Sequence, residues 1–156
     1  MRRLGRQPAL LFPAAMVANA DPNALDDYEE LTFTPTLTFG GSLTGITYAS
    51  GGQIGRCTKI GRHVHVEGRV ILTSKGTLTS GAPTISGLPF AGLSLVPAGP
   101  FRYLNVALTT GTILGGYVNG SVIQLQAMGA SGCADLTPVM LSNTSDLLFA
   151  ADYATA

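Results

Sequence analysis

Apolar and polar residues alternate along much of this chain, most clearly in two segments. In residues 32–39, Phe33, Leu37 and Phe39 share one face, and threonines occupy the other. In residues 63–73, aliphatic side chains alternate with histidine, glutamate and arginine. An alternation with period two is typical of half-buried β-strands, so both segments are predicted to be strands.

Shorter segments repeat this pattern between turns rich in glycine, proline and serine. Gly68 falls on the apolar face of its strand, which indicates a bulge or a close backbone approach, and Pro35 marks a strand edge or a strand start. Asn119-Gly120 is a strong hairpin signal because both residues tolerate positive φ. Gly51-Gly52 is read as a turn between two strands. The further strands are predicted at residues 46–48, 54–60, 84–85, 102–108, 112–118, 121–128 and 147–153.

These strands, without a convincing amphipathic helix among them, predict an all-β fold: an antiparallel β-sandwich or jelly-roll-like domain with an extended N-terminal arm. A length of 156 residues fits one domain. The arm is assigned to residues 1–30, with one short helical turn at 24–30, and the β-sandwich module to residues 31–156. The segments do not repeat at a fixed period, which disfavours propellers and solenoids.

The chain carries few charges, and they balance. With 9 basic and 9 acidic residues there is no net charge to attract nucleic acid or an anionic membrane, so neither partner is expected. Residues 31–156 hold only six basic and four acidic residues. Ordinary domains have about a quarter charged residues. Much of the outer surface is therefore expected to be covered by other chains.

The first 20 residues are basic and apolar, and two prolines interrupt them. This composition suits an extended arm that docks on another protein; a secretory signal ending at Ala18-Asn19-Ala20 and a disordered tail are the alternatives. No apolar run reaches the length of a membrane span, so membrane insertion is not expected. Cys57 and Cys133 have no motif spacing and are read as free thiols. The docking residues of the arm are predicted to be Arg2, Arg3, Arg6, Leu10, Leu11 and Phe12.

Part of the chain resembles a module of tail fibre, tail spike and other virion proteins of tailed bacteriophages and prophages. The likeness spans residues 25–90. The segments that carry it are LDDYEE at 25–30, FTPTLTFGG at 33–41, GITY at 45–48, TKIGR at 58–62, GRVILTSKG at 68–76 and GLPF at 87–90.

The resemblance implies a β-rich and commonly trimeric domain at the far end of a fibre or spike, where it contributes to assembly or host-surface attachment. Two departures qualify it. The module usually follows a long fibre-forming or enzymatic region, whereas here it follows only a 30-residue leader. Cys57 and His65 also stand where the family tends to have aromatic residues, which puts an aromatic ligand platform there in doubt.

His63, His65 and Glu67 project from one face of a predicted strand. Two imidazoles and a carboxylate are a ligand set for a zinc-class metal ion, and three chains could instead offer His65 around a threefold axis. The alternative is a plain polar sheet face on which Glu67 lies close to Arg69. No cofactor is expected.

Catalysis has little support in the sequence. Glycoside hydrolysis requires two carboxyl groups on opposite sides of a glycosidic bond, and those after residue 31 lie far apart in sequence. A Gly-x-Ser-x-Gly nucleophile motif is absent, so no catalytic residue is assigned and the chain is not expected to be an enzyme. The carboxyl groups in question are Glu67, Asp135, Asp146 and Asp152.

Glycan binding is the sharper non-enzymatic hypothesis. Sugar recognition uses aromatic faces beside amide and hydroxyl groups, and the second half of the chain has both. Packing of the tyrosines inside the sandwich or between subunits is the alternative. The candidate glycan contacts are Tyr103, Tyr117, Gln124 and Gln126, with Asn105 and Asn119 nearby in sequence.

The sequence thus leads to the hypothesis of a non-enzymatic virion structural protein, assembled in the cytoplasm of a bacterial host. It is expected to be a homotrimer of short tail-fibre, spike or head-fibre type that docks by its arm on a capsid or tail protein and contributes to attachment through a host-surface glycan. The main alternative is a purely architectural capsid decoration or tail connector. A secreted carbohydrate-binding module is the third hypothesis.

Overall fold

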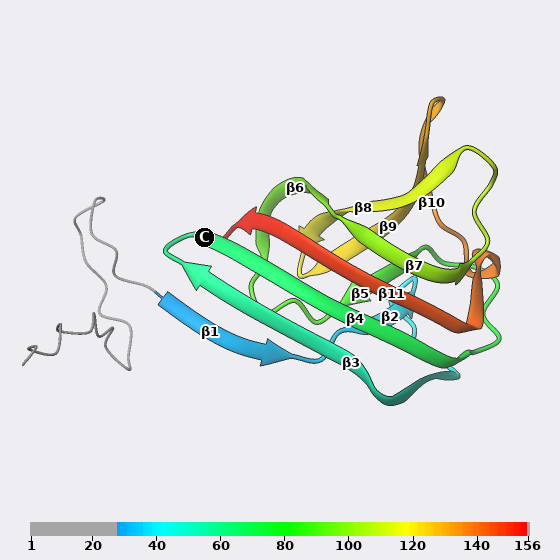
Figure 1. Ribbon diagram of the computed structural model, residues 1–156, viewed down its shortest axis with the longest axis horizontal. Helices are drawn as coiled ribbons and strands as arrows, with labels where there is room; N and C mark the ends of the chain where they lie inside the picture. Colours follow the sequence, from blue (N-terminus) through cyan, green and yellow to red (C-terminus); the bar gives the residue numbers. More distant parts are fainter. Residues whose placement is uncertain (1–27, 156) are drawn as a thin grey trace, which may run out of the picture.

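The computed structural model describes residues 28–155, which form antiparallel strands and one short 3₁₀ turn (Figure 1). The strands are β1 (Tyr28–Phe33), β2 (Thr36–Phe39), β3 (Ile46–Ile60), β4 (His63–Lys75), β5 (Pro83–Ser86), β6 (Gly92–Ala98), β7 (Phe101–Val106), β8 (Thr112–Gly120), β9 (Val122–Gly129), β10 (Gly132–Asp135) and β11 (Leu141–Ala154). The 3₁₀ turn is Pro138–Met140. The predicted docking residues Arg2, Arg3, Arg6, Leu10, Leu11 and Phe12 lie outside the described residues.

The strands form two sheets. One has five strands in the order β1-β3-β4-β11-β7, and the other has six, with β2-β5-β9-β8-β6 in order and β10 paired to β9. All the strand pairs are antiparallel. The long strands β3, β4 and β11 run side by side in Figure 1. The prediction of an all-β, antiparallel sandwich-like architecture is confirmed.

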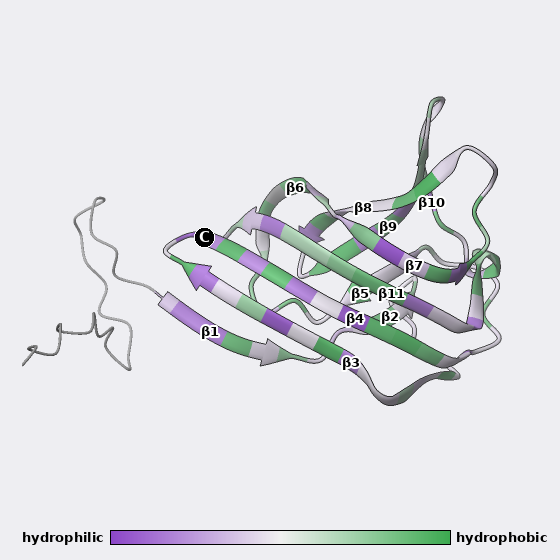
Figure 2. Ribbon diagram, viewed as in Figure 1, coloured by the Kyte–Doolittle hydropathy of each residue, from purple (hydrophilic) through white to green (hydrophobic). Residues whose placement is uncertain are grey.

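The core lies between the sheets and draws on both. Val64, Val66 and Val70 of β4 are fully buried, as are Ile123 and Leu125 of β9. Hydropathy bands alternate along β4 and β11, as expected for strands with one face inside and one outside (Figure 2). The predicted division of the strand at 63–73 into an apolar and a polar face is therefore confirmed.

A row of aromatic residues and glycines crosses the inner face of the five-stranded sheet. Phe33, Gly55, Gly68, Phe149 and Phe101 are successive cross-strand partners. A Cβ on Gly55 would lie 2.6 Å from the Phe33 ring, and one on Gly68 would lie 2.5 Å from the Phe149 ring. The rings fill the space that the two glycines leave. The close approach predicted at Gly68 is confirmed, and the pairing is regular there rather than bulged.

The segment predicted as one strand at 32–39 is two strands in different sheets. β1 pairs with β3, whereas β2 pairs with β5, and Pro35 lies between them. Proline has no N–H group to donate to a neighbouring strand, so the chain passes from one sheet to the other at a residue that could not complete the backbone hydrogen bonding of either. β1 covers Tyr28–Phe33, so residues 28–30 form strand rather than the end of the helical turn expected at 24–30, whose first four residues lie outside the described residues.

Two predicted turns differ from the structure in detail. Residues 46–60 form the single strand β3, and its pairing with β4 is irregular between Tyr48 and Gln53 instead of ending at a turn. The β8–β9 hairpin is confirmed, but Asn119 pairs with Val122, so Gly120 and its successor form the loop. Gly120 has φ +57° and Asn119 has no positive φ. A glycine at the first of two loop positions is the usual choice for a type II′ turn.

Two tyrosines join parts of the structure that are distant in sequence. The Tyr48 hydroxyl accepts a hydrogen bond from the Leu37 N–H at 3.0 Å and donates to its carbonyl, which links the two sheets. The buried Tyr153 hydroxyl donates to the Phe90 carbonyl at 2.8 Å, and burial raises the pKa of this phenol. These bonds satisfy polar groups that the sandwich would otherwise bury unpaired.

Candidate functional site

The outer face of the five-stranded sheet carries most of the chemistry-bearing side chains of the described chain. Successive residues of a strand point to opposite faces, and the buried valines of β4 place His63, His65, Glu67 and Arg69 outside. The cross-strand pairing adds residues of β3, β11 and β7 to the same face.

A hollow of about 490 Å³ lies on this face, across β3, β4, β11 and β7. Ile54, Leu148, Ala150 and Pro100 give it apolar walls and floor. Ala150 pairs with Glu67, and its small side chain leaves room between longer neighbours. We call this hollow the arginine groove, because Arg56, Arg69 and Arg102 also line it.

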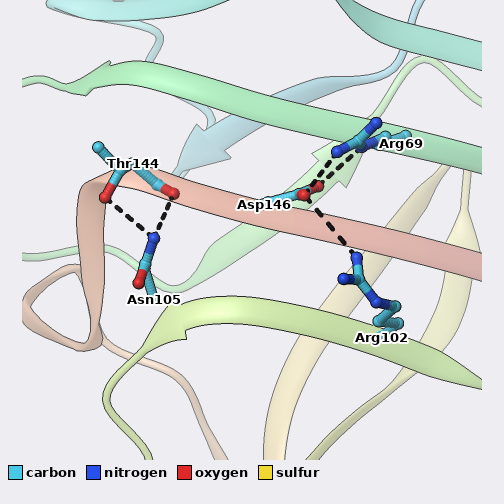
Figure 3. A network of polar contacts seen from close by, with 5 residues as sticks. All are labelled: Arg69, Arg102, Asn105, Thr144 and Asp146. Atoms are coloured by element: carbon cyan, nitrogen blue, oxygen red, sulfur yellow. Dashed lines mark hydrogen bonds and ion pairs between the residues drawn. The ribbon is translucent and has the colours of Figure 1, made fainter.

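Asp146 binds Arg69 and lies close to Arg102 (Figure 3). Arg69 donates from Nε to Asp146 Oδ1 at 2.9 Å and from Nη2 to Oδ2 at 2.6 Å. Arg102 approaches the same carboxylate from the other side, with Nη1 3.9 Å from Oδ2. Arg69's hydrogen bonds hold the pKa of the Asp146 carboxyl below its usual value, and the same contact raises the pKa of Arg69. Asp146 is thus an ionised anchor between the two guanidinium groups.

An irregularity in β11 sets the position of Asp146. The register against β7 shifts between Leu141 and Asp146. Asn105, which has φ +57°, donates from Nδ2 to the Thr144 carbonyl at 2.9 Å and to its Oγ1 at 3.1 Å (Figure 3). Ser145 returns a bond from its Oγ to the Asn105 carbonyl at 2.8 Å. These three hydrogen bonds between Asn105 and residues 144–145 fix the chain just before Asp146, where regular pairing with β4 begins.

Glu67 has a different partner from the one expected. It lies 3.4 Å from Arg56 of β3 across the strand pair, whereas Arg69 is engaged by Asp146. Arg56 and Glu67 are directly opposite in the register, and neighbours on the same strand face are about 7 Å apart. The expectation that Glu67 lies close to Arg69 is therefore replaced by a cross-strand ion pair.

His63 and His65 meet a carboxylate, but not that of Glu67. His65 Nδ1 is 2.9 Å from Asp152 Oδ1, and His63 Nε2 is 3.7 Å from the same oxygen. Within residues 28–155, no three His, Cys, Asp or Glu side chains are arranged to hold a metal ion. The structure does not bring the predicted ligand set of His63, His65 and Glu67 together.

The candidate glycan contacts lie on two different surfaces. Tyr117, Gln124 and Gln126 share the outer face of the six-stranded sheet, where Tyr117 and Gln124 are cross-strand partners. Gln126 donates to Asp135 at 2.9 Å. Tyr103 pairs with the buried Leu147 and packs against the core from the five-stranded sheet. Tyr103 is therefore separated from the other three.

Asn105 and Asn119 differ in their availability to a ligand. The Asn105 amide is hydrogen-bonded to Thr144, whereas the exposed Asn119 lies on the same face of β8 as Tyr117, beside the hairpin loop. The Gln124 Nε2 is buried, and no hydrogen-bond partner for it is found in the described part of the chain.

The four carboxyl groups weighed for catalysis do not form a pair across a groove. Asp135 lies on β10 in the six-stranded sheet, and the other three lie on the five-stranded sheet. Asp146 is bound by Arg69, Glu67 by Arg56 and Asp152 by His65. These three carboxylates thus each have a basic partner, and Asp135 accepts a hydrogen bond from the Gln126 amide.

The two thiols differ in exposure. Cys57 is buried on the inner face of β3, and burial, with a smaller effect from Glu29, raises its pKa. Cys133 is exposed on β10. Both are free thiols, as expected; Cys57 packs in the core as a small apolar side chain, whereas Cys133 faces solvent.

Sequence reasoning missed the arginine groove. In the sequence, Asp146 stands out only as one of four candidate catalytic carboxyl groups, and no pattern singles out Arg56 or Arg102. Alternation within β7 could have placed Arg102 on an outer face, but only the long-range pairing of β11 with both β4 and β7 brings the three arginines together.

In the described part of the chain, no helix is long and apolar enough to cross a membrane. A scan against models of known protein families finds none that matches this sequence. A search of curated proteins likewise finds none with significant similarity to it.

Proposed function

We propose that the chain is a virion structural protein of a tailed phage or phage-like particle, of short tail-fibre, spike or head-fibre type, and that it contributes to host-surface attachment. The sequence resemblance over residues 25–90 supports this proposal. The observed antiparallel β architecture is compatible with it.

The resembling segments coincide with features that the sandwich needs. The segment 58–62 contains the β3–β4 turn, where Gly61 has φ +56°. The segment 68–76 contains Gly68, which receives the Phe149 ring. In the segment 87–90, Leu88 is buried and the Phe90 carbonyl accepts from Tyr153. The likeness thus follows residues with structural roles.

The observation that carries the proposal is the exposed apolar edge strand β6. It pairs within its sheet with β8, its sequence GLSLVPA has no charge, and Leu93 and Leu95 are 52% and 65% exposed. Native edge strands are usually protected by charge or covered by another chain. Of the other end strands, β1 carries glutamates, β7 carries Arg102 and the uncharged β2 is largely buried, so β6 is the end strand that exposes apolar side chains without a charge.

We propose that β6 lies in the contact between copies of a homotrimer. Leu95→Lys tests this, because it places a charge on the edge without disturbing a buried side chain. Ile113→Lys is the matched control, since Ile113 is 63% exposed on β8, away from the residues of β8 that pair with β6. In sedimentation equilibrium, we expect wild type and the control to have three times the chain mass and Leu95→Lys to be smaller. A monomeric wild type would contradict the trimer.

Membership of a particle is tested separately. Particles from the strain that encodes the chain are purified on a density gradient and analysed by quantitative mass spectrometry. We expect the chain at a fixed number of copies per particle, and its absence from purified particles would refute the virion assignment.

A further inference from the structure

We propose that the arginine groove binds the carboxylate of an acidic saccharide, with Arg102 and Arg56 as its hydrogen-bond donors and Arg69 as a positioning residue. The choice of a surface saccharide as ligand rests on the proposed role in attachment. The site differs from the candidate glycan contacts Tyr117, Gln124 and Gln126, which lie on the other sheet.

The first argument is the availability of donors. The Arg102 side chain is 60% exposed, and the acidic atom nearest to it among residues 28–155 is Asp146 Oδ2 at 3.9 Å, beyond hydrogen-bonding distance. Arg56 is 73% exposed and makes one long contact of 3.4 Å with Glu67. Both guanidinium groups therefore have N–H groups free for a ligand. The planar fork of an arginine matches a carboxylate in geometry and charge.

The second argument is the charge of the groove. Three arginines meet two carboxylates, and the Asp146 side chain is only 9% exposed and engaged by Arg69. The exposed side chains of the groove therefore have a net positive charge and lie beside its apolar walls. An occupant that complements it carries negative charge at its rim and a less polar face, as the ring of a uronic acid does.

The third argument comes from what the groove lacks. Its floor consists of the central strands β4 and β11, which are paired on both sides, so an extended peptide would find no backbone groups with which to pair. Phe101 and Phe149, the aromatic residues of its lining, pack toward the core and offer no outer face for stacking a nucleic-acid base. A compact anionic ring suits the groove better than either polymer.

The volume is compatible with such a ligand. Ligand pockets commonly measure about 300–1,000 Å³, and the groove measures about 490 Å³. It is an open hollow on a sheet face, so one groove is expected to bind weakly. Copies in an oligomer would add their contributions through avidity.

The test is an NMR titration of the full chain with tetragalacturonate, with its methyl ester as the uncharged control ligand. We expect the amide signals of β4, β7 and β11 around the groove to shift with the acid and not with the ester. Arg102→Gln is expected to weaken binding roughly tenfold, the effect of losing one charged hydrogen bond. Lys75→Gln removes the same charge from the far end of β4 and is expected to leave affinity unchanged.

The proposal would be overturned by equal binding of acid and ester, by unchanged affinity in Arg102→Gln, or by shifts confined to the six-stranded sheet. A change of oligomeric state in Arg102→Gln would assign the groove to contacts between copies and overturn it as well. Failure here is distinguishable from failure of the proposed function, because the chain would still be found in purified particles.

Discussion

Replacing Asp146 by asparagine removes the charge that joins β11 to Arg69 while it keeps the size of the side chain. Two hydrogen bonds from Arg69, at 2.9 and 2.6 Å, end on a carboxylate that is only 9% exposed. Hydrogen bonds to charged groups contribute about 1.5–3 kcal/mol. The Arg69 side chain is 42% exposed, so water can replace part of the lost interaction. We therefore expect Asp146→Asn to lower the free energy of unfolding by about 1–2 kcal/mol at pH 7.

The pKa of Asp146 determines how this loss of stability changes with pH. The folded-state pKa of Asp146 lies below the ordinary carboxyl value, so its contribution is fully present above the unfolded-state pKa of about 4 and is lost as pH falls through the folded-state pKa. Urea unfolding at fixed protein concentration measures the difference between variant and wild type at each pH. We expect that difference to be constant from pH 7 to pH 5 and to shrink in more acidic buffer.

Asp152→Asn is the matched control. Its carboxylate is 57% exposed and faces histidines on the same sheet face, and exposed pairs contribute about 0–1 kcal/mol. The account of the Arg69 contact would be refuted by a loss in Asp146→Asn no larger than that in Asp152→Asn, or by a loss that does not diminish as the carboxyl group becomes protonated.

Two further expectations concern the inner face. Gly68→Ala places a Cβ 2.5 Å from the Phe149 ring, so we expect urea unfolding to show a free energy of unfolding lower by about 1–3 kcal/mol, the usual range for overpacking. Gly55→Ala meets a half-buried ring on an edge strand and should lower it less. Equal stability of Gly68→Ala and wild type would contradict the packing of the ring over the glycine. Maleimide at pH 7 is expected to label the exposed Cys133 in the folded protein and the buried Cys57 only after unfolding. Mass spectrometry of the labelled peptides measures this, and equal labelling of both thiols in the folded protein would contradict the burial of Cys57.

The alternation of apolar and polar residues was sufficient to predict the strands that bury one face and expose the other. Residues 63–73 alternate except at Gly68 and Ile71, and they form β4 with the predicted faces. β6 was missed because a serine, a proline and a glycine interrupt its short apolar run, and β10 because its four residues are exposed and stabilised mainly by pairing with β9. The division between β1 and β2 was also missed, since alternation continues through Pro35 although the strands join different sheets.

The candidate site was less accessible from the sequence because it depends on pairing over long distances. The residues Arg69, Arg102 and Asp146 belong to three strands, and only the order β4-β11-β7 places them side by side. The histidines of β4 were recognised as a same-face pair, yet their carboxylate partner Asp152 comes from β11 rather than from their own strand. Same-strand spacing is readable from sequence, whereas the choice of a neighbouring strand is fixed by the whole fold.

The proposed role in attachment is tested by the adsorption rate to host cells of purified particles with and without the chain, at equal genome copies. We expect particles that lack it to adsorb much more slowly and the full chain, supplied by complementation, to restore the rate. Equal adsorption of both preparations would contradict the claim and favour a purely architectural role.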